Sequence, residues 1–194
     1  MSIDKACVAG AGPNPQSDAV LIGADGGLKN VFVYVKEGLD AAYSFDIPAT
    51  AVVLDQKGCI YTPRVLGIRA GQALTVLNSD ETLHNVHAIP MANQEFNSGM
   101  PFKDTKLTKT FTVPEVMVRF KCDVHPWMGA YVGVTAHPFF AVTDASGAFE
   151  IKGLPPGTYT IEAWHERFGR RTSTVKIDPK GAATTAFTFD ATSK

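Results

Sequence analysis

Three residues of one short segment offer ligand atoms for a soft metal ion. Between Cys122 and Met128 a thiol, an imidazole and a thioether stand at three-residue spacing, on Cys122, His125 and Met128. A thiolate, imidazoles and a weak axial thioether suit a copper ion that cycles between two oxidation states, and they match hard cations poorly. The segment therefore predicts one mononuclear copper site with Cys122 as its central ligand.

Such a site needs a second imidazole from another part of the chain. The run from Asn78 to His87 supplies two candidates, His84 and His87, about forty residues before Cys122, a separation normal for neighbouring strands of a Greek key. The two histidines are three residues apart, so on a strand they point to opposite faces and only one can face Cys122. The spacing leaves the choice open, because a β-bulge would reverse it.

The elements around these residues are predicted to be strands, and the fold class to be all-β. Short runs of β-branched and aromatic residues alternate with polar ones and are separated by Gly, Pro, Asn and Asp. The alternation is clearest at Val31, Val33 and Val35, at Leu74 and Val76, and at Val118, Phe120 and Cys122. Cys122 is the last inward residue of its strand before Pro126 forces a loop, so a core strand delivers the thiol to that loop.

The C-terminal stretch carries two turn patterns, Thr-Asp-x-x-Gly-x-Phe at 143–149 and Leu-Pro-Pro-Gly-x-Tyr at 154–159. In these patterns it resembles the carboxypeptidase-regulatory-like, or transthyretin-like, β-sandwich, in which residues 28–36 would suit an earlier strand. We therefore expect a copper domain, residues 50–137, inserted into a second, smaller sandwich made of residues 1–49 and 138–194. Pairing of 31–35 with 159–163 would favour this nested order, and pairing of 28–48 with 74–77 would favour consecutive domains.

The two candidate ligand segments resemble those of the cupredoxins, in particular amicyanin and plastocyanin, which have an early His-Asn-Val and a later Cys-x-x-His loop ending in Met. The resemblance implies a Greek-key cupredoxin β-sandwich with type 1 (blue) copper. It assigns His84, Cys122 and His125 as equatorial ligands and Met128 as the axial one. Asn85 matches the asparagine that locks the ligand loop, although its usual Ser or Thr partner is replaced here by Asp123.

The remaining cysteines, Cys7 and Cys59, have no His or Cys close by, so we expect them to form a disulfide, with two unpaired buried thiols as the alternative. A disulfide places the protein in an oxidising compartment, periplasmic or secreted. No signal peptide is present in this chain, and Met1 is interpreted as the start of a trimmed mature form.

The composition of the chain limits the classes of partner that it is expected to bind. A formal charge of -1 without a basic stripe argues against nucleic acid, and no apolar run is long enough for a transmembrane segment. We expect His125 to expose an imidazole edge within an apolar patch that includes Pro126 and Trp127. This patch would dock a redox protein partner, such as a c-type cytochrome or another electron carrier.

The predicted function is the transfer of single electrons between such partners. An enzymatic role is not expected, because five histidines leave too few for a further copper site and no hydrolase motif is present. Two alternatives remain: a copper storage or delivery protein, and a binding or scaffold module that copper merely stabilises.

Overall fold

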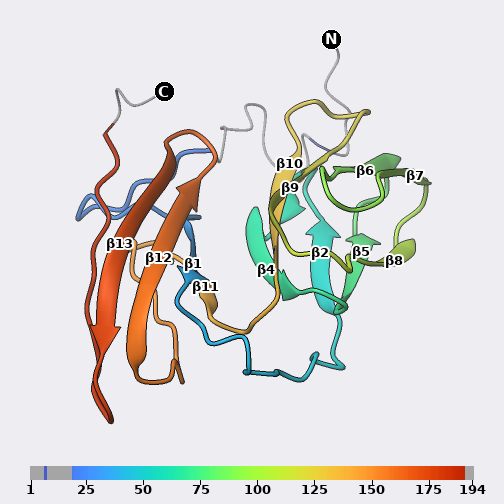
Figure 1. Ribbon diagram of the computed structural model, residues 1–194. Coiled ribbons are helices and arrows are strands. Elements are labelled where there is room, and N and C mark those ends of the chain that lie inside the picture. The colour runs from blue at the N-terminus through green and yellow to red at the C-terminus, as the bar shows by residue number, and fades with distance from the viewer. Residues whose placement is uncertain (1–6, 8–18, 191–194) are drawn as a thin grey trace. The chain divides into compact units, whose positions relative to one another are not determined.

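The computed structural model describes residue 7 and residues 19–190 (Figure 1). Met1, interpreted above as the start of a mature chain, lies outside them. The prediction of an all-β fold is confirmed. The described residues form thirteen strands: β1 (Phe32–Glu37), β2 (Val52–Gln56), β3 (Tyr61–Thr62), β4 (Val65–Arg69), β5 (Ala73–Asn78), β6 (His84–Ile89), β7 (Phe96–Met100), β8 (Lys106–Thr110), β9 (Glu115–Lys121), β10 (Gly129–Thr135), β11 (Phe140–Val142), β12 (Gly157–His165) and β13 (Gly169–Ile177). No helix in this part of the chain is long and apolar enough to cross a membrane.

The described residues divide into two compact units, and residues 47–136 belong to the first. This unit contains a five-stranded sheet, in the order β4-β10-β9-β6-β7, and a four-stranded sheet, in the order β3-β2-β5-β8. Most neighbours are antiparallel, but β10 runs parallel to β4 and β2 runs parallel to β5. Both sheets contribute to one apolar core, with Leu54 and Val76 from one and Val118 and Phe120 from the other.

Alternation along β6 decides which side chains face that core. Successive side chains of a strand point to opposite faces. His84, Val86 and Ala88 are therefore buried, whereas Asn85 and His87 lie on the other, partly exposed face. The two candidate histidines point in opposite directions, and His84 is the one inside the sandwich.

The second unit contains residues 19–46 and 137–190. Its sheet has the order β11-β1-β12-β13, and β1 pairs antiparallel with β12, with Val33 opposite Ala163 and Val35 opposite Ile161. This is the pairing on which a nested order of the domains depends. The segments 149–154 and 187–189 pack on the core of this unit, although they contain none of its named strands.

The predicted disulfide between Cys7 and Cys59 is present. Both residues are buried in the core of the first unit. The expected boundaries placed Cys7 with residues 1–49 in the second sandwich, whereas its side chain packs in the core of the first unit, where it is bonded to Cys59. The other residues of 1–18 lie outside the described part of the chain.

Two neighbouring positions on β2 test the assignment of the core. Leu54 is fully buried, and Val53 beside it is 47% exposed. Leu54→Ala should lower the free energy of unfolding by about 2–5 kcal/mol, because it removes buried apolar atoms and leaves a cavity. Val53→Ala should change it by less than about 0.5 kcal/mol. Urea unfolding of both variants measures the difference, and equal effects would contradict the inward direction of Leu54.

Candidate metal centre

The candidate ligands lie where the loop between β9 and β10 meets the start of β6. Lys121 and Gly129 pair at the base of this loop, so the chain leaves the sheet and returns to it within residues 122–128. Inside the loop the Met128 N–H donates to the His125 carbonyl (2.9 Å), and the Cys122 N–H donates to the Met128 carbonyl (3.3 Å). These two bonds fold the loop back over the end of the core.

Three of the predicted ligands converge in this place. The Nδ1 atoms of His84 and His125 are 2.9 Å apart, and Cys122 Sγ lies 3.8 Å from His125 Nδ1. The three residues are buried, and their ligand atoms lie within 4.8 Å of one another. The structure thus brings together one sulfur and two nitrogens from segments that are far apart in the sequence.

A carboxylate fixes the orientation of the first imidazole. His84 Nε2 donates to Asp80 Oδ2 at 2.9 Å, so its Nδ1 directs a lone pair into the cluster. Asp80 also accepts hydrogen bonds from the backbone N–H groups of Gly58 and Cys59, both at 2.8 Å. Burial would raise the pKa of the Asp80 carboxyl, but these bonds and the one from His84 outweigh it and lower that pKa.

The environment of Cys122 favours its thiolate, the form that binds metal. Burial would raise the pKa of this thiol, but its contact with His84 and hydrogen bonds from backbone N–H groups, that of Asn85 among them, lower it. The Asn85 N–H lies 3.4 Å from the sulfur. Burial of His84 would lower the pKa of its imidazole, but its contacts with Cys122 and Asp80 raise it.

Asn85 ties β6 to the ligand loop through Asp123. Its Oδ1 accepts a hydrogen bond from the Asp123 N–H, and its Nδ2 donates to Asp123 Oδ2 at 3.1 Å. Lys121 Nζ lies 2.7 Å from the other carboxylate oxygen. Bonds from Lys121 and Asn85 lower the pKa of the Asp123 carboxyl. Asp123 thus occupies the position of the usual Ser or Thr and makes the contact with its backbone and its side chain.

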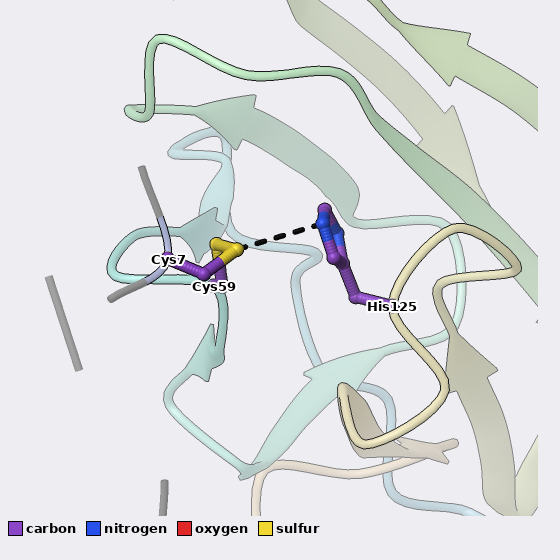
Figure 2. Close-up of side chains that lie close together, drawn as sticks. All are labelled: Cys7, Cys59 and His125. Atoms are coloured by element: carbon purple, nitrogen blue, oxygen red, sulfur yellow. Dashed lines mark hydrogen bonds between the residues drawn. A yellow bond between two sulfur atoms is a disulfide. The ribbon is translucent and has the colours of Figure 1, made fainter. Parts of the chain in front are cut away.

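The remaining residues predicted for the ligand loop differ in their exposure to solvent. Met128 is buried on the same loop, whereas Pro126 and Trp127 are exposed. His125 is 4% exposed, so the expected exposure of its imidazole edge is not found. Cys7 Sγ lies 3.5 Å from its Nε2. Figure 2 draws this contact between the disulfide and the imidazole.

His87 makes a separate set of contacts on the outer face of β6. Its Nδ1 lies 3.0 Å from Asp123 Oδ2, and its Nε2 lies 2.8 Å from Glu95 Oε1. It therefore supports the position of Asp123 and faces away from Cys122.

Sequence reasoning assigned no role to Asp80 or Tyr61. The Tyr61 hydroxyl lies 3.0 Å from the Asn85 carbonyl and 3.1 Å from the Lys121 carbonyl, each adjacent to a candidate ligand. Burial, and after it the charge of Cys122, raises the pKa of this phenol. Asp80 stands within the segment that carries His84, but no spacing rule marks a carboxylate four residues before a strand histidine as its partner.

The donor set fits a single soft or borderline ion. Metal bonds of about 2.0 Å to nitrogen and 2.3 Å to sulfur, as known for zinc, allow one ion to join donors up to about 4 Å apart. Both separations, 2.9 Å between the nitrogens and 3.8 Å between sulfur and nitrogen, fall within this reach. Cys7 and Cys59 also lie near His125, but their disulfide removes both thiolates as ligands.

The depressed pKa of Asp80 leads to a pH-dependent prediction for the metal-free protein. Because the folded-state pKa is lower than in the unfolded chain, the carboxylate stabilises the fold above its ordinary pKa, and this stabilisation is lost as pH falls through the folded-state value. Asp80→Ala should cost about 1–3 kcal/mol at neutral pH and progressively less in acid.

Urea unfolding at several pH values measures this effect. Glu81→Ala is the matched control, because the neighbouring Glu81 side chain is 81% exposed and should contribute little at any pH. An Asp80→Ala cost that stays constant down to strongly acidic pH would contradict the assigned role of the carboxylate.

Comparison with known proteins gives separate findings for the two units. A family model of the carboxypeptidase regulatory-like domain matches residues 117–190, which begin in β9 and continue through the C-terminal part of the second unit. This match covers less than half of the chain. The comparison with curated proteins gives no match.

Solved structures similar to part of the chain include copper proteins. A copper-containing nitrite reductase from Thermus scotoductus SA-01 has 20% identity and a TM-score of 0.42, over 51% of this chain but only 25% of its own. A mutant of amicyanin in its Cu(I) form has 24% identity and a TM-score of 0.40, over 53% of this chain and 98% of its own. A purple cupredoxin from Nitrosopumilus maritimus has 23% identity and a TM-score of 0.38, over 45% of this chain and 100% of its own. Each of these similarities covers only part of the chain, and the family-model match is limited to residues 117–190.

Proposed function

We propose that His84, Cys122 and His125 hold one copper ion in a type 1 site, with Met128 as the axial ligand, and that the protein carries single electrons between redox partners outside the cytoplasm. One observation carries the proposal: two imidazole nitrogens and a sulfur with a lowered thiol pKa converge in a buried space. Two nitrogen lone pairs and a thiolate repel one another at these distances, and a cation between them would turn this repulsion into attraction.

The choice of copper rests on the donor types. Two imidazoles, a thiolate and the thioether of Met128 on the same loop suit copper better than magnesium or calcium, which prefer oxygen ligands. Met128 distinguishes the set from the Cys and His sites of structural zinc. The bound copper would supply reversible one-electron chemistry. The protein's own contribution is to hold the ligands in nearly one arrangement for both oxidation states.

The contacts around the ligands support this rigidity. His84 is fixed by Asp80, and the Cys122 loop is fixed to β6 by the two hydrogen bonds between Asn85 and Asp123. Outer contacts of this kind orient ligands and tune a metal centre. A preformed ligand set needs little rearrangement on each transfer, which favours a carrier of electrons over an enzyme that must also bind substrate.

An apolar surface beside the site suits a protein partner. Val124, Pro126 and Trp127 are exposed on the ligand loop, and the Trp127 ring centroid lies 5.2 Å from that of His125. We infer that a redox protein, such as a c-type cytochrome or another electron carrier, docks here. The electron would pass through Trp127 and His125, because this indole contacts the buried ligand and also reaches solvent.

The proposed location outside the cytoplasm rests on the disulfide. Cytosolic reductants keep most thiols apart, whereas the periplasm and the extracellular space allow Cys7–Cys59 to persist. A copper storage or delivery role would use the same ligands, but it needs an ion that exchanges readily. Burial of all three ligands argues for slow exchange and therefore for a carrier.

Copper loading tests the type of site. The protein loaded with Cu(II) should show an intense thiolate-to-copper band in the visible and the electron paramagnetic resonance signal of type 1 copper. Cys122→Ser should lose both, since the band requires the sulfur. A folded, copper-loaded parent without the band would remove the type 1 assignment and favour storage, delivery or a structural role.

The choice between the two histidines of β6 gives a second, internally controlled test. His84→Ala should abolish the band or displace it strongly, because it removes a ligand on the inner face of the strand. His87→Ala should keep the band and one copper per chain, because His87 faces Asp123 and Glu95 on the outer face. Copper content and visible spectra of both variants show which histidine is the ligand. Loss of the band in His87→Ala, with the band kept in His84→Ala, would reverse the assignment.

A further inference from the structure

The Nε2 edge of His125 lies against the Cys7–Cys59 disulfide. Cys7 Sγ is 3.5 Å from this nitrogen, and the sulfur–sulfur bond lies beside the imidazole in Figure 2. Cys59 is fully buried, and Cys7 is almost so. The disulfide therefore packs against the Nε2 edge of a ring that is almost wholly shielded from solvent.

This contact leaves Nδ1 as the nitrogen of His125 that could bind an ion, since Nε2 faces the disulfide. With an ion bound through Nδ1, the proton of the neutral ring would be on Nε2 and would point toward the sulfur, which has no hydrogen and is a weak acceptor. Nδ1 is the atom 2.9 Å from His84 Nδ1. The disulfide thus packs against the outer edge of the His125 ring, as Asp80 does for His84.

Cys59 is fixed from both sides of the site. Its backbone N–H donates to Asp80 Oδ2 at 2.8 Å, and Asp80 also accepts from His84. Its carbonyl accepts a hydrogen bond of 2.9 Å from Trp127 Nε1, on the ligand loop. One residue of the disulfide is thus connected to the surroundings of both imidazoles.

We propose that the Cys7–Cys59 disulfide is a lid on the metal centre: it positions the His125 ring, covers its Nε2 edge and slows exchange of the bound ion. The part of the proposal that concerns the ion rests on the proposed function, and the part that concerns the ring does not. Cys7 and Cys59 are positioning residues in this role, since they act through His125.

The first test uses the metal-free full chain and chemical labelling. Diethyl pyrocarbonate acylates accessible imidazole nitrogens, and peptide mass spectrometry gives the rate at each histidine. In a variant with Cys7→Ala and Cys59→Ala, His125 should react at least about tenfold faster than in the parent, because local opening of its cover is no longer needed. His84, held by Asp80, should remain slow, and His87 on the outer face should react equally in both.

Leu54→Ala is the matched control for lost stability. It destabilises the same unit while leaving the disulfide intact, so His125 should stay protected in it. Equal labelling of His125 in the parent and in the variant without the disulfide would overturn the lid. Fast labelling in Leu54→Ala as well would assign the protection to global stability and would also overturn it.

If the doubly substituted protein does not fold, the same labelling is done on the parent after reduction by a water-soluble phosphine. Two electrons from the phosphine break the sulfur–sulfur bond; water supplies the oxygen of the phosphine oxide and the two protons of the new thiols. His125 labelling should accelerate after reduction, and an unchanged rate in a folded, reduced protein would contradict the proposal.

The second test follows the ion. A chromogenic Cu(I) chelator should remove copper at least about tenfold faster when the disulfide is absent, with a shifted thiolate-to-copper band in the Cu(II) form. The protein without the disulfide could instead lose copper at the parent's rate and keep the parent's thiolate-to-copper band, while His125 is labelled fast. That result would show that the disulfide covers the ring only, and it would overturn the proposed effect on the ion. A parent that binds no copper would overturn the proposed function, while the labelling result would still decide the lid.

Discussion

The structure depends on the burial of three polar donor groups at one end of an apolar β-sandwich. An unsatisfied polar group in such a core costs several kilocalories per mole, and a buried charge costs more. His84 and Cys122 lie among Val86, Phe120 and their apolar neighbours. Their polar atoms are nevertheless partnered: Asp80 accepts from one imidazole, and the Asn85 N–H reaches the sulfur. In the proposed function, the inward-facing nitrogen and sulfur atoms would be the ligands of the bound ion.

The partners of the ligands are themselves anchored in the sheets. Tyr61, on the short strand β3, lies within hydrogen-bond distance of carbonyls on both ligand-bearing strands, and Gln56 Nε2 donates to its hydroxyl at 3.1 Å. Asp80 joins the His84 ring to the Gly58–Cys59 turn. The four-stranded sheet thus holds the edge of the five-stranded one that carries the candidate ligands, so their geometry is a property of the whole sandwich and not of the loop alone.

Much of this arrangement could be predicted from the sequence, because it follows from local rules. Alternation predicted the inward face of Val118, Phe120 and Cys122, and the strand period separated His84 from His87. The missing parts are those that depend on tertiary contacts between distant segments. No pattern predicts that Asp80 turns back to His84, that Tyr61 bridges two strands, or that Cys7 packs on His125.

The covered imidazole changes how electrons would reach the site. When a histidine ligand exposes its edge, a partner can approach the ligand directly, and surface polarity around the ring controls docking. Here His125 is buried and Trp127 is partly exposed, with their rings in contact and the indole N–H bonded to Cys59. Trp127 thus offers one packed connection from the surface to the cluster. In the proposed function, the two sides of the loop would meet separate demands: the disulfide side would exclude water and competing ligands, and the indole side would offer an apolar surface to a partner.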